Sequence, residues 1–180
     1  GEYMYSFNAY DNDFTGGVRV TMGDLDGDGD EEIITVPSNS NKPLKIFNME
    51  GDVVNEFYPF GEDNQSGMFV ATGDTNGNLR EEIIVSLDNG DSEAVNVFTL
   101  YGAQVSRFYP FDDLDGKKSI RIAAGDTDGD GMDEVVSVLG SGYEPIVRVH
   151  TKKGNLIKSF YAYDKNYKNG VFVASGELDG

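Results

Sequence analysis

Short apolar stretches that alternate with polar residues recur along the chain and predict β-strands. In the first unit we expect strands at Val18 to Gly23, Glu32 to Val36, Leu44 to Asn48 and Val53 to Phe60. Period-two alternation between clusters of Gly, Asp and Asn is typical of half-buried strands. The two following units repeat it as MFVATG, EIIVSL, VNVFTL and QVSRFYPF, then as IRIAAG, EVVSVL, VRVHTK and LIKSFYAY. No stretch is predicted to be helical.

Aromatic clusters set the period of the repeat. They read SFNAYD, EFYPFG, RFYPFD and SFYAYD, and their first phenylalanines, Phe7, Phe57, Phe108 and Phe160, are separated by 50, 51 and 52 residues. Periods of this length indicate solenoids, propellers or arrays. Four short antiparallel strands per unit describe a propeller blade. We therefore predict an all-β fold, a β-propeller of four-stranded antiparallel blades of about 50 residues.

The repeat register predicts a single propeller segment spanning residues 1–180. It divides into the last strand of a preceding blade (1–10), three complete blades (11–60, 61–111 and 112–163) and the start of a further blade (164–180). An orphan D strand at one end and an orphan A strand at the other leave strand edges open. We expect either a slice of a longer array or a chain that assembles with copies of itself.

Charge and composition narrow the classes of partner. The chain has 180 residues, with 32 acidic and 14 basic residues and a net charge of -18. This balance excludes nucleic acid and anionic lipid as expected partners, because both need a basic surface, but it suits a cation. With 38% hydrophobic residues the chain should fold. Cysteine is absent, and no apolar run approaches the roughly 20 residues of a membrane helix, so we expect no membrane insertion.

The loop between the first two strands of each unit concentrates acidic residues. The first loop lies in GDLDGDGDEEII, from Gly23 to Ile34, and the third in GDTDGDGMDEVV, from Gly125 to Val136. Two unit charges about 4 Å apart repel by roughly 4 kcal/mol at an effective dielectric near 20. Alternating oxygen ligands, a turning glycine and a terminal carboxylate are what Ca²⁺ requires. Bound calcium would convert this repulsion into attraction.

The frame Asp-x-Asp-x-Asp-Gly-x-x-Glu assigns candidate ligands by position. In the first loop they are Asp24, Asp26, Asp28 and Glu32, with the backbone carbonyl of Asp30; in the third they are Asp126, Asp128, Asp130 and Glu134, with the carbonyl of Met132. The middle loop keeps Asp74 and Glu82 but has Asn76, Asn78 and Arg80, and Leu79 replaces the glycine, so we predict a weak or empty site. Glu177 and Asp179 would begin a truncated fourth site.

An EF-hand is the obvious alternative for a D-x-D-x-D-G loop. Its last ligand is the twelfth residue and its flanks are helices. Here the glutamate arrives at the ninth position, and the flanks, VRVTMG and EIITV, are strand-like. The plainer alternative is a solvated acidic hairpin loop. Two full copies in register with the repeat favour calcium.

The residues SFNAYDNDFTGGVRVTMGDLDGDGDEEII, followed by PLKIFNMEGDVVNEFYPF, closely resemble the FG-GAP and VCBS-like repeats of bacterial secreted and surface proteins. These repeats are related to the calcium-binding blades of integrin alpha chains. The resemblance covers essentially the whole chain. It implies a β-propeller with calcium in the loops of one rim and a role outside the cell in adhesion, recognition or scaffolding, although fold alone does not fix function.

Other candidate chemistry is sparse. His150 is the only histidine, and it aligns with Phe47 and Phe98, so we expect a packing residue. One histidine and no cysteine exclude two-histidine zinc sites and Cys-His dyads; paired carboxylates of the glycosidase type stay open. The recurring aromatic clusters are expected to pack between blades. Three tyrosines that vary between units, Tyr101, Tyr143 and Tyr167, are candidates for sugar stacking.

These patterns favour a non-enzymatic, calcium-binding propeller module of an extracellular or cell-surface protein, acting in adhesion, recognition or assembly. Calcium would rigidify the loop between the first two strands of each blade. Expected partners are calcium, a protein or glycan ligand, and further copies through open blade edges. A carbohydrate-binding propeller, or a non-catalytic appendage of a polysaccharide-degrading enzyme, are the alternatives.

Overall fold

The computed structural model describes residues 6–89, 92–116 and 118–176. These residues form three four-stranded antiparallel sheets and contain no helix. Sheet 1 consists of β1 (Val18–Gly23), β2 (Glu32–Pro37), β3 (Leu44–Phe47) and β4 (Val53–Phe57). Sheet 2 consists of β5 (Gly67–Gly73), β6 (Glu82–Asp88), β7 (Val95–Phe98) and β8 (Gln104–Phe108). Sheet 3 consists of β9 (Ile120–Gly125), β10 (Glu134–Leu139), β11 (Ile146–His150) and β12 (Leu156–Tyr161).

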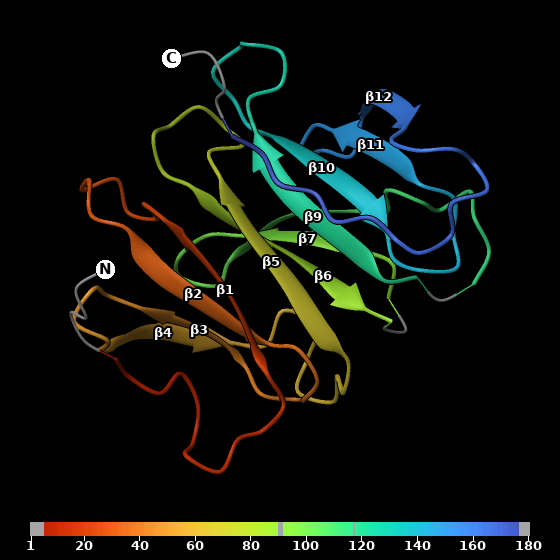
Figure 1. Cartoon of the computed structure of the whole chain (residues 1–180). Coiled ribbons are helices and arrows are strands. Elements are labelled where there is room, and N and C mark those ends of the chain that lie inside the picture. The colour runs from red at the N-terminus through yellow and green to blue at the C-terminus, as the bar shows by residue number, and fades with distance from the viewer. Residues whose placement is uncertain (1–5, 90–91, 117, 177–180) are drawn as a thin grey trace.

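Each sheet is a simple meander in which consecutive strands pair (Figure 1). The predicted first, second and third strands of every unit are confirmed to within two residues at each end. All three sheets also carry a register shift at the same place, between the third and fourth strands, at Ile46/Phe47, Val97/Phe98 and Val149/His150. The sequence repeat is therefore a structural repeat down to its irregularities.

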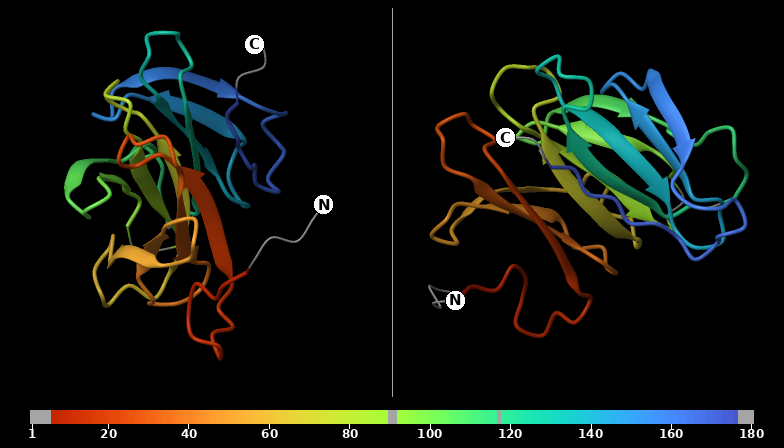
Figure 2. Two further views of the ribbon diagram at one scale, coloured as in Figure 1. Left: turned by 90° about the vertical axis from the view of Figure 1, so that its left-hand side faces the viewer. Right: turned by 45° about the horizontal axis from the view of Figure 1, so that its top comes forward.

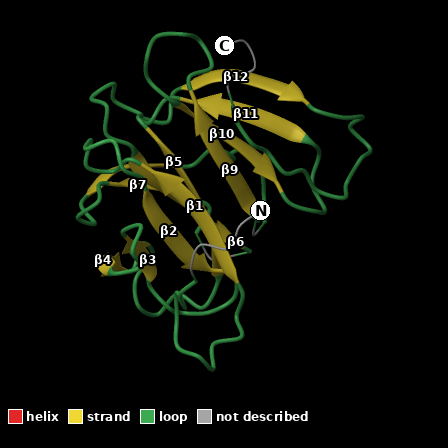
Figure 3. Cartoon of the chain, turned by 60° about the vertical axis from the view of Figure 1, so that its left-hand side comes forward, coloured by secondary structure: helices red, strands yellow, loops and turns green. Residues whose placement is uncertain are grey.

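The first strands of the three sheets lie next to one another, and the later strands extend away from this line (Figure 1; Figure 3). Glycines at the ends of these strands permit the close approach. A Cβ atom on Gly23 would lie 2.8 Å from the Thr72 Cβ, and one on Gly73 would lie 2.7 Å from the Ala124 Cβ. Real Cβ atoms do not approach this closely, so a larger residue would separate the sheets.

Two hydrophobic cores hold the sheets together. Between sheets 1 and 2, fully buried side chains include Ile34, Ile46 and Ile83, and between sheets 2 and 3 they include Ile84 and Val135. Neighbouring residues of a strand point to opposite faces, so Ile83 and Ile84 serve different cores. The second strand of sheet 2 is consequently apolar on both faces.

The recurring aromatic residue joins each unit to the next, as expected. Phe7 packs on Phe47 with ring centroids 4.9 Å apart, and Phe57 packs on Phe98 at 5.0 Å. In the third case Phe108 packs on His150 at 5.4 Å. His150 is therefore the packing residue that its alignment predicts.

The fourth strands are shorter than predicted. They were expected to reach Phe60, Phe111 and Tyr163, whereas β4, β8 and β12 end at Phe57, Phe108 and Tyr161. Pro59 and Pro110 follow in the first two and have no N–H to donate to a ladder. In the third unit Ala162 stands at the position of these prolines, and it donates its N–H to the Pro145 carbonyl oxygen at 2.9 Å. Strand β12 accordingly extends one residue further than β4 and β8.

The predicted orphan strands are not observed as paired strands among the described residues. Residues 6–10 and 164–176 are not hydrogen-bonded as strands, and residues 1–5 and 177–180 lie outside the described part. A first strand receives its ladder from the second strand of its own sheet, as β1 does from β2. Residues 170–176 have no such partner among the described residues, although they lie along β9 (Figure 1).

The three sheets form an open, curved array rather than a closed ring (Figure 2). The first strands share one line, and closure of the predicted propeller is not observed among the described residues. Within the described residues, no helix has the length and apolar character needed to cross a membrane.

Candidate metal centre

The loop between β1 and β2 gathers three carboxylates. Asp24, Asp26 and Glu32 each place an oxygen within 4.8 Å of the others. Asp24 is fixed by the loop itself, since its two carboxylate oxygens accept the N–H groups of Gly27 at 2.7 Å and Gly29 at 3.0 Å. Both glycines have positive φ, 78° and 93°, which brings their N–H groups inward.

The loop between β9 and β10 repeats this arrangement 102 residues later. Asp126, Asp128 and Glu134 form the second cluster within the same 4.8 Å limit. The Asp126 carboxylate accepts the N–H groups of Gly129 at 2.7 Å and Gly131 at 3.0 Å. The two predicted sites thus share one local structure, and it follows from the same glycine and aspartate positions.

Two predicted ligands of each site lie outside these clusters. Asp28 accepts the N–H of Asp30 at 2.9 Å, and Asp130 accepts that of Met132 at 2.8 Å. The Asp28 and Asp130 side chains therefore order the second half of the loop. The assignment of the Asp30 and Met132 carbonyls as ligands stays a prediction.

The middle loop keeps the backbone shape without the second carboxylate. The Asp74 oxygens accept four backbone N–H groups, from Asn76, Gly77, Asn78 and Leu79, at 2.7 to 3.3 Å. The Asn76 side-chain amide donates to Glu82. An N–H donor thus occupies the place where Asp26 and Asp128 present an oxygen, and no middle cluster is found among the described residues.

Leu79 and Arg80 also set the middle loop apart. Leu79 has a φ of 63° and is 83% exposed, whereas its equivalents are Gly29 and Gly131. Arg80 does not turn toward its own loop: a Cβ on Gly27 would lie 3.0 Å from the Arg80 Cγ. The cation of the middle loop therefore lies against the first loop.

Backbone hydrogen bonds link the three loops in series. The Glu81 N–H donates to the Asp24 carbonyl oxygen and the Asp133 N–H donates to that of Asp74, both at 2.9 Å. Burial raises the pKa of both carboxyls, Glu81 and Asp133. Sequence inspection missed these contacts, and the recurring acid one residue before Glu32, Glu82 and Glu134 is the signal that identifies the position.

The loop carboxylates also have perturbed protonation. Burial is the main cause that raises the pKa of Glu32, and the charges of Asp26, Asp28 and Asp24 add to it, against the Leu25 N–H that it accepts at 3.0 Å. By contrast, the N–H groups of Gly131 and Gly129 lower the pKa of Asp126. The first cluster therefore holds negative charge at a free-energy cost that a cation would offset.

The donor set fits calcium. It consists of carboxylate oxygens without nitrogen or sulfur, which favours a hard cation. Two oxygens that bind one Ca²⁺ at about 2.3 to 2.6 Å lie at most about 5 Å apart, which the 4.8 Å limit respects. Asp24, Asp26 and Glu32 would hold one ion, and Asp126, Asp128 and Glu134 another. The truncated site at Glu177 and Asp179 lies outside the described residues.

Hydroxyl groups beside two of the glutamates were not predicted as part of the loops. The Thr127 hydroxyl donates to Glu134 at 2.7 Å, and that of Thr75 donates to Glu82. Leu25 occupies the equivalent place in the first loop. A threonine therefore contacts the glutamate in loops two and three, while in loop one the described contact is the Leu25 backbone N–H.

The remaining candidate residues differ in their exposure. Tyr101 is 81% exposed and Tyr167 is 38% exposed, but Tyr143 packs against the core between sheets 2 and 3. Tyr143 is therefore not an exposed stacking surface. His150 is buried, and its Nδ1 has no hydrogen-bond partner among the described residues.

No family model and no curated protein sequence matches the chain. Among solved structures it is similar to the V. cholerae biofilm matrix protein Bap1, at 15% sequence identity and a TM-score of 0.36. The similarity covers 78% of this chain and 28% of the Bap1 chain, so the chain spans little more than a quarter of that protein's length.

Proposed function

We propose that the chain is a calcium-stabilised β-propeller segment that acts outside the cell in adhesion, recognition or assembly, without catalysis. The observation that carries the proposal is the pair of matching carboxylate clusters at equivalent places of sheets 1 and 3. Calcium would fix the connection between the first two strands of each unit. The acidic rim would then keep its shape despite its charge.

Blades of a propeller are the simplest account of the three sheets. Each sheet is a four-stranded meander, and the first strands lie together while the fourth strands lie outermost. Aromatic residues and two continuous cores connect successive sheets. These features agree with the resemblance to FG-GAP and VCBS-like repeats, and further sheets would be needed to close a ring.

A binding role outside the cell is supported by what surrounds the sites. The clusters lie in loops at the ends of rigid strands, where binding surfaces are common. Millimolar calcium sites made of exposed acidic loops are typical of extracellular modules. The absence of cysteine is compatible with this placement, because the sheets supply their own cores.

Calorimetric titration of calcium into chelated protein tests the proposal. We expect about two ions per chain for the wild type. Asp26→Asn and Asp128→Asn should each leave one ion, since each removes a charge from one cluster. Asp63→Asn, which removes the same charge from an exposed acid outside the loops, should leave both. Equal binding by all four proteins would contradict the assignment.

A polar groove between the β4–β5 connection and sheet 2 favours carbohydrate recognition as the second candidate. It has a volume of about 440 Å³ and is lined by several amide side chains and a guanidinium: Asn64, Gln65, Asn96, Gln104 and Arg107. Such groups suit neutral hydroxyl ligands, with Phe60 as an apolar wall. A glycan array on the calcium-loaded protein tests this, and Asn64→Ala should weaken any saturable signal.

A further inference from the structure

Sheet 1 leaves uncovered a face whose equivalents are buried in the other two sheets. Arg19 points toward sheet 2, where its guanidinium lies 3.8 Å from the centre of the Phe69 ring. Its strand neighbours Val18 and Val20 therefore point the other way, and they are 46% and 61% exposed. Their equivalents in β9, Ile120 and Ile122, are only 1% and 8% exposed because sheet 2 covers them.

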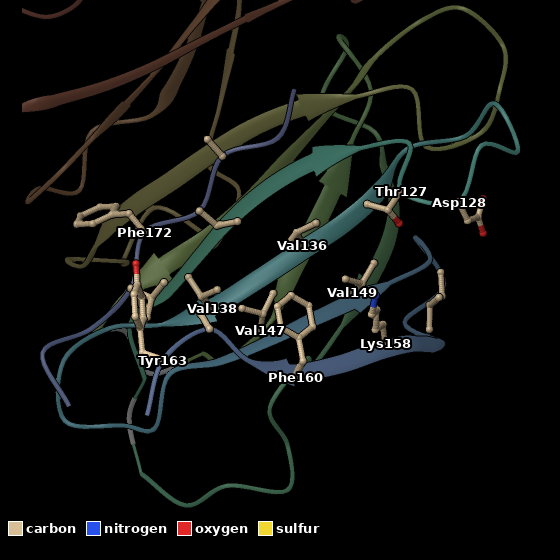
Figure 4. A pocket seen from close by; sticks show the side chains of 15 residues that line it. Thr127, Asp128, Val136, Val138, Val147, Val149, Lys158, Phe160, Tyr163 and Phe172 are labelled. Atoms are coloured by element: carbon tan, nitrogen blue, oxygen red, sulfur yellow. The ribbon is translucent and has the colours of Figure 1, made fainter. Parts of the chain in front are cut away.

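The complementary face of sheet 3 has no neighbouring sheet on it among the described residues, although its valines are only 0 to 9% exposed. A groove of about 610 Å³ runs over a cluster of four valines, Val136, Val138, Val147 and Val149 (Figure 4). The equivalent residues of sheet 1, Ile34, Val36, Leu44 and Ile46, are fully buried under sheet 2. At the outer end of the groove, Ile157 and Phe160 are each 45% exposed.

The inner end of this groove is covered by residues 170–176, which imitate the first strand of a neighbouring sheet. Arg121 donates to the Val171 carbonyl oxygen at 2.7 Å and lies 3.8 Å from the centre of the Phe172 ring. Arg19 makes the same two contacts with Met68 and Phe69, at the same two distances. The segment thus occupies the place that β5 has on sheet 1, but without strand pairing.

Charge is divided between the two ends of the chain. Residues 145–169 carry six basic residues and one acidic residue, and Lys158 lines the groove. Residues 11–60, which include sheet 1, carry 11 acidic and three basic residues. The basic border of one apolar face therefore matches the acidic surroundings of the other.

We propose that the open face of sheet 3 binds the open face of sheet 1 of a second copy of this chain. The second copy's β1 would take the place of residues 170–176, and Phe160 would replace Phe7 on the second copy's Phe47. Strand β1 of the second copy is already paired within its own sheet 1. That sheet would also cover Ile157 and Phe160, which residues 170–176 leave exposed. Because the two faces differ, the contact is heterologous and generates rings or open chains.

Sedimentation velocity over a range of concentrations tests the proposal on the calcium-loaded protein. The wild type should associate. The association should weaken at high salt, because residues of opposite charge border the two faces. Val20→Glu and Phe160→Glu should each be monomeric. Val105→Glu, which places the same charge on a 49% exposed valine of β8 in sheet 2, should assemble like the wild type.

Mixing the two monomeric variants gives the decisive result. Each retains one intact face, so an equimolar mixture should form one-to-one dimers and nothing larger. A wild type that stays monomeric at all concentrations would overturn the proposal, as would a mixture that does not dimerise. Calorimetry should find two calcium ions on both variants, so loss of assembly is separable from loss of the proposed metal sites.

Discussion

The side-chain amide of Asn76 donates a hydrogen bond to Glu82, at the place where the other two loops bring a second carboxylate to the glutamate. This position therefore distinguishes the middle loop from the other two where the glutamate finds its partner. An aspartate there creates a cluster of negative charge that a cation would stabilise. An asparagine there satisfies the glutamate within the protein.

Asn76→Asp should convert the middle loop into a calcium site. In chelator the variant loses the amide donor and gains a repelling carboxylate beside Glu82, so we expect it to be less stable by about 1 to 3 kcal/mol. In calcium the loss should be recovered, and calorimetry should find about three ions per chain instead of two. An unchanged number of ions would show that the acid alone does not make the site.

Asp26→Ala and Asp128→Ala should lower the melting temperature only when calcium is present. A ligand at 100 times its dissociation constant stabilises the folded state by about 2.7 kcal/mol, and each variant gives up one such contribution. In chelator the melting temperature should be nearly unchanged. Asp63→Ala serves as the control in both buffers, and equal losses in both for the loop variants would contradict a metal role.

Leu79→Gly should stabilise the protein. Leu79 has a φ of 63°, a left-handed conformation that costs a non-glycine residue roughly 1 to 2 kcal/mol. The greater freedom of glycine in the unfolded chain offsets roughly 0.5 to 1 kcal/mol of this. We expect a net gain of about 0.5 to 1 kcal/mol in a urea unfolding experiment. Tyr101→Gly, at an equally exposed residue without positive φ, should lose stability instead.

His150→Phe should remove an acid sensitivity of the wild type. Burial, assisted by the charge of Arg148 and opposed by that of Asp112, lowers the pKa of His150 to about 4, from its ordinary 6.5. Between pH 6.5 and 4 the unfolded chain binds more protons at this residue than the folded chain does. Folding stability therefore falls as the pH drops through this window, by up to about 3 kcal/mol.

The measurement compares urea unfolding of both proteins at pH 7 and at pH 4. The carboxylates are the same in both proteins. The change in stability between pH 7 and pH 4 in the wild type, minus the change in the variant, therefore isolates the contribution of His150. Phenylalanine is the residue that sheets 1 and 2 use at this place, as Phe47 and Phe98, so the variant should fold normally. A stability difference that does not change with pH would mean that the imidazole binds protons equally in the folded and the unfolded chain, which contradicts the prediction.

Local signals in the sequence predicted local features of the structure. The alternation at Val18 to Gly23 and the paired isoleucines at Ile33 and Ile34 define strands that the structure contains. The strand ends at Phe57 and Phe108 were misjudged because the aromatic pattern continues past the residues where Pro59 and Pro110 interrupt hydrogen bonding. The three clustered acids of each site were identified from spacing alone.

Contacts between units were harder to predict. The stack of Arg19 on Phe69 joins residues 50 positions apart, and it recurs once in the described part of the chain, as Arg121 on Phe172. The equivalent position of the second unit is Phe69 rather than an arginine, so the two examples do not form a recognisable sequence pattern. The hydrogen bonds between successive loops involve backbone atoms, so the side-chain types give little indication of them.

Residues 170–176 rest on β9 in the place of a first strand without a paired second strand among the described residues, and such a contact has a consequence for how an array of sheets could be built. A segment that settles on the previous sheet before its own sheet exists uses that sheet as a template. Each finished unit then prepares the next one, so folding would propagate from the N-terminus as the ribosome releases the chain. The order of synthesis and the order of folding would then coincide, and unpaired apolar strands would be exposed to solvent only briefly.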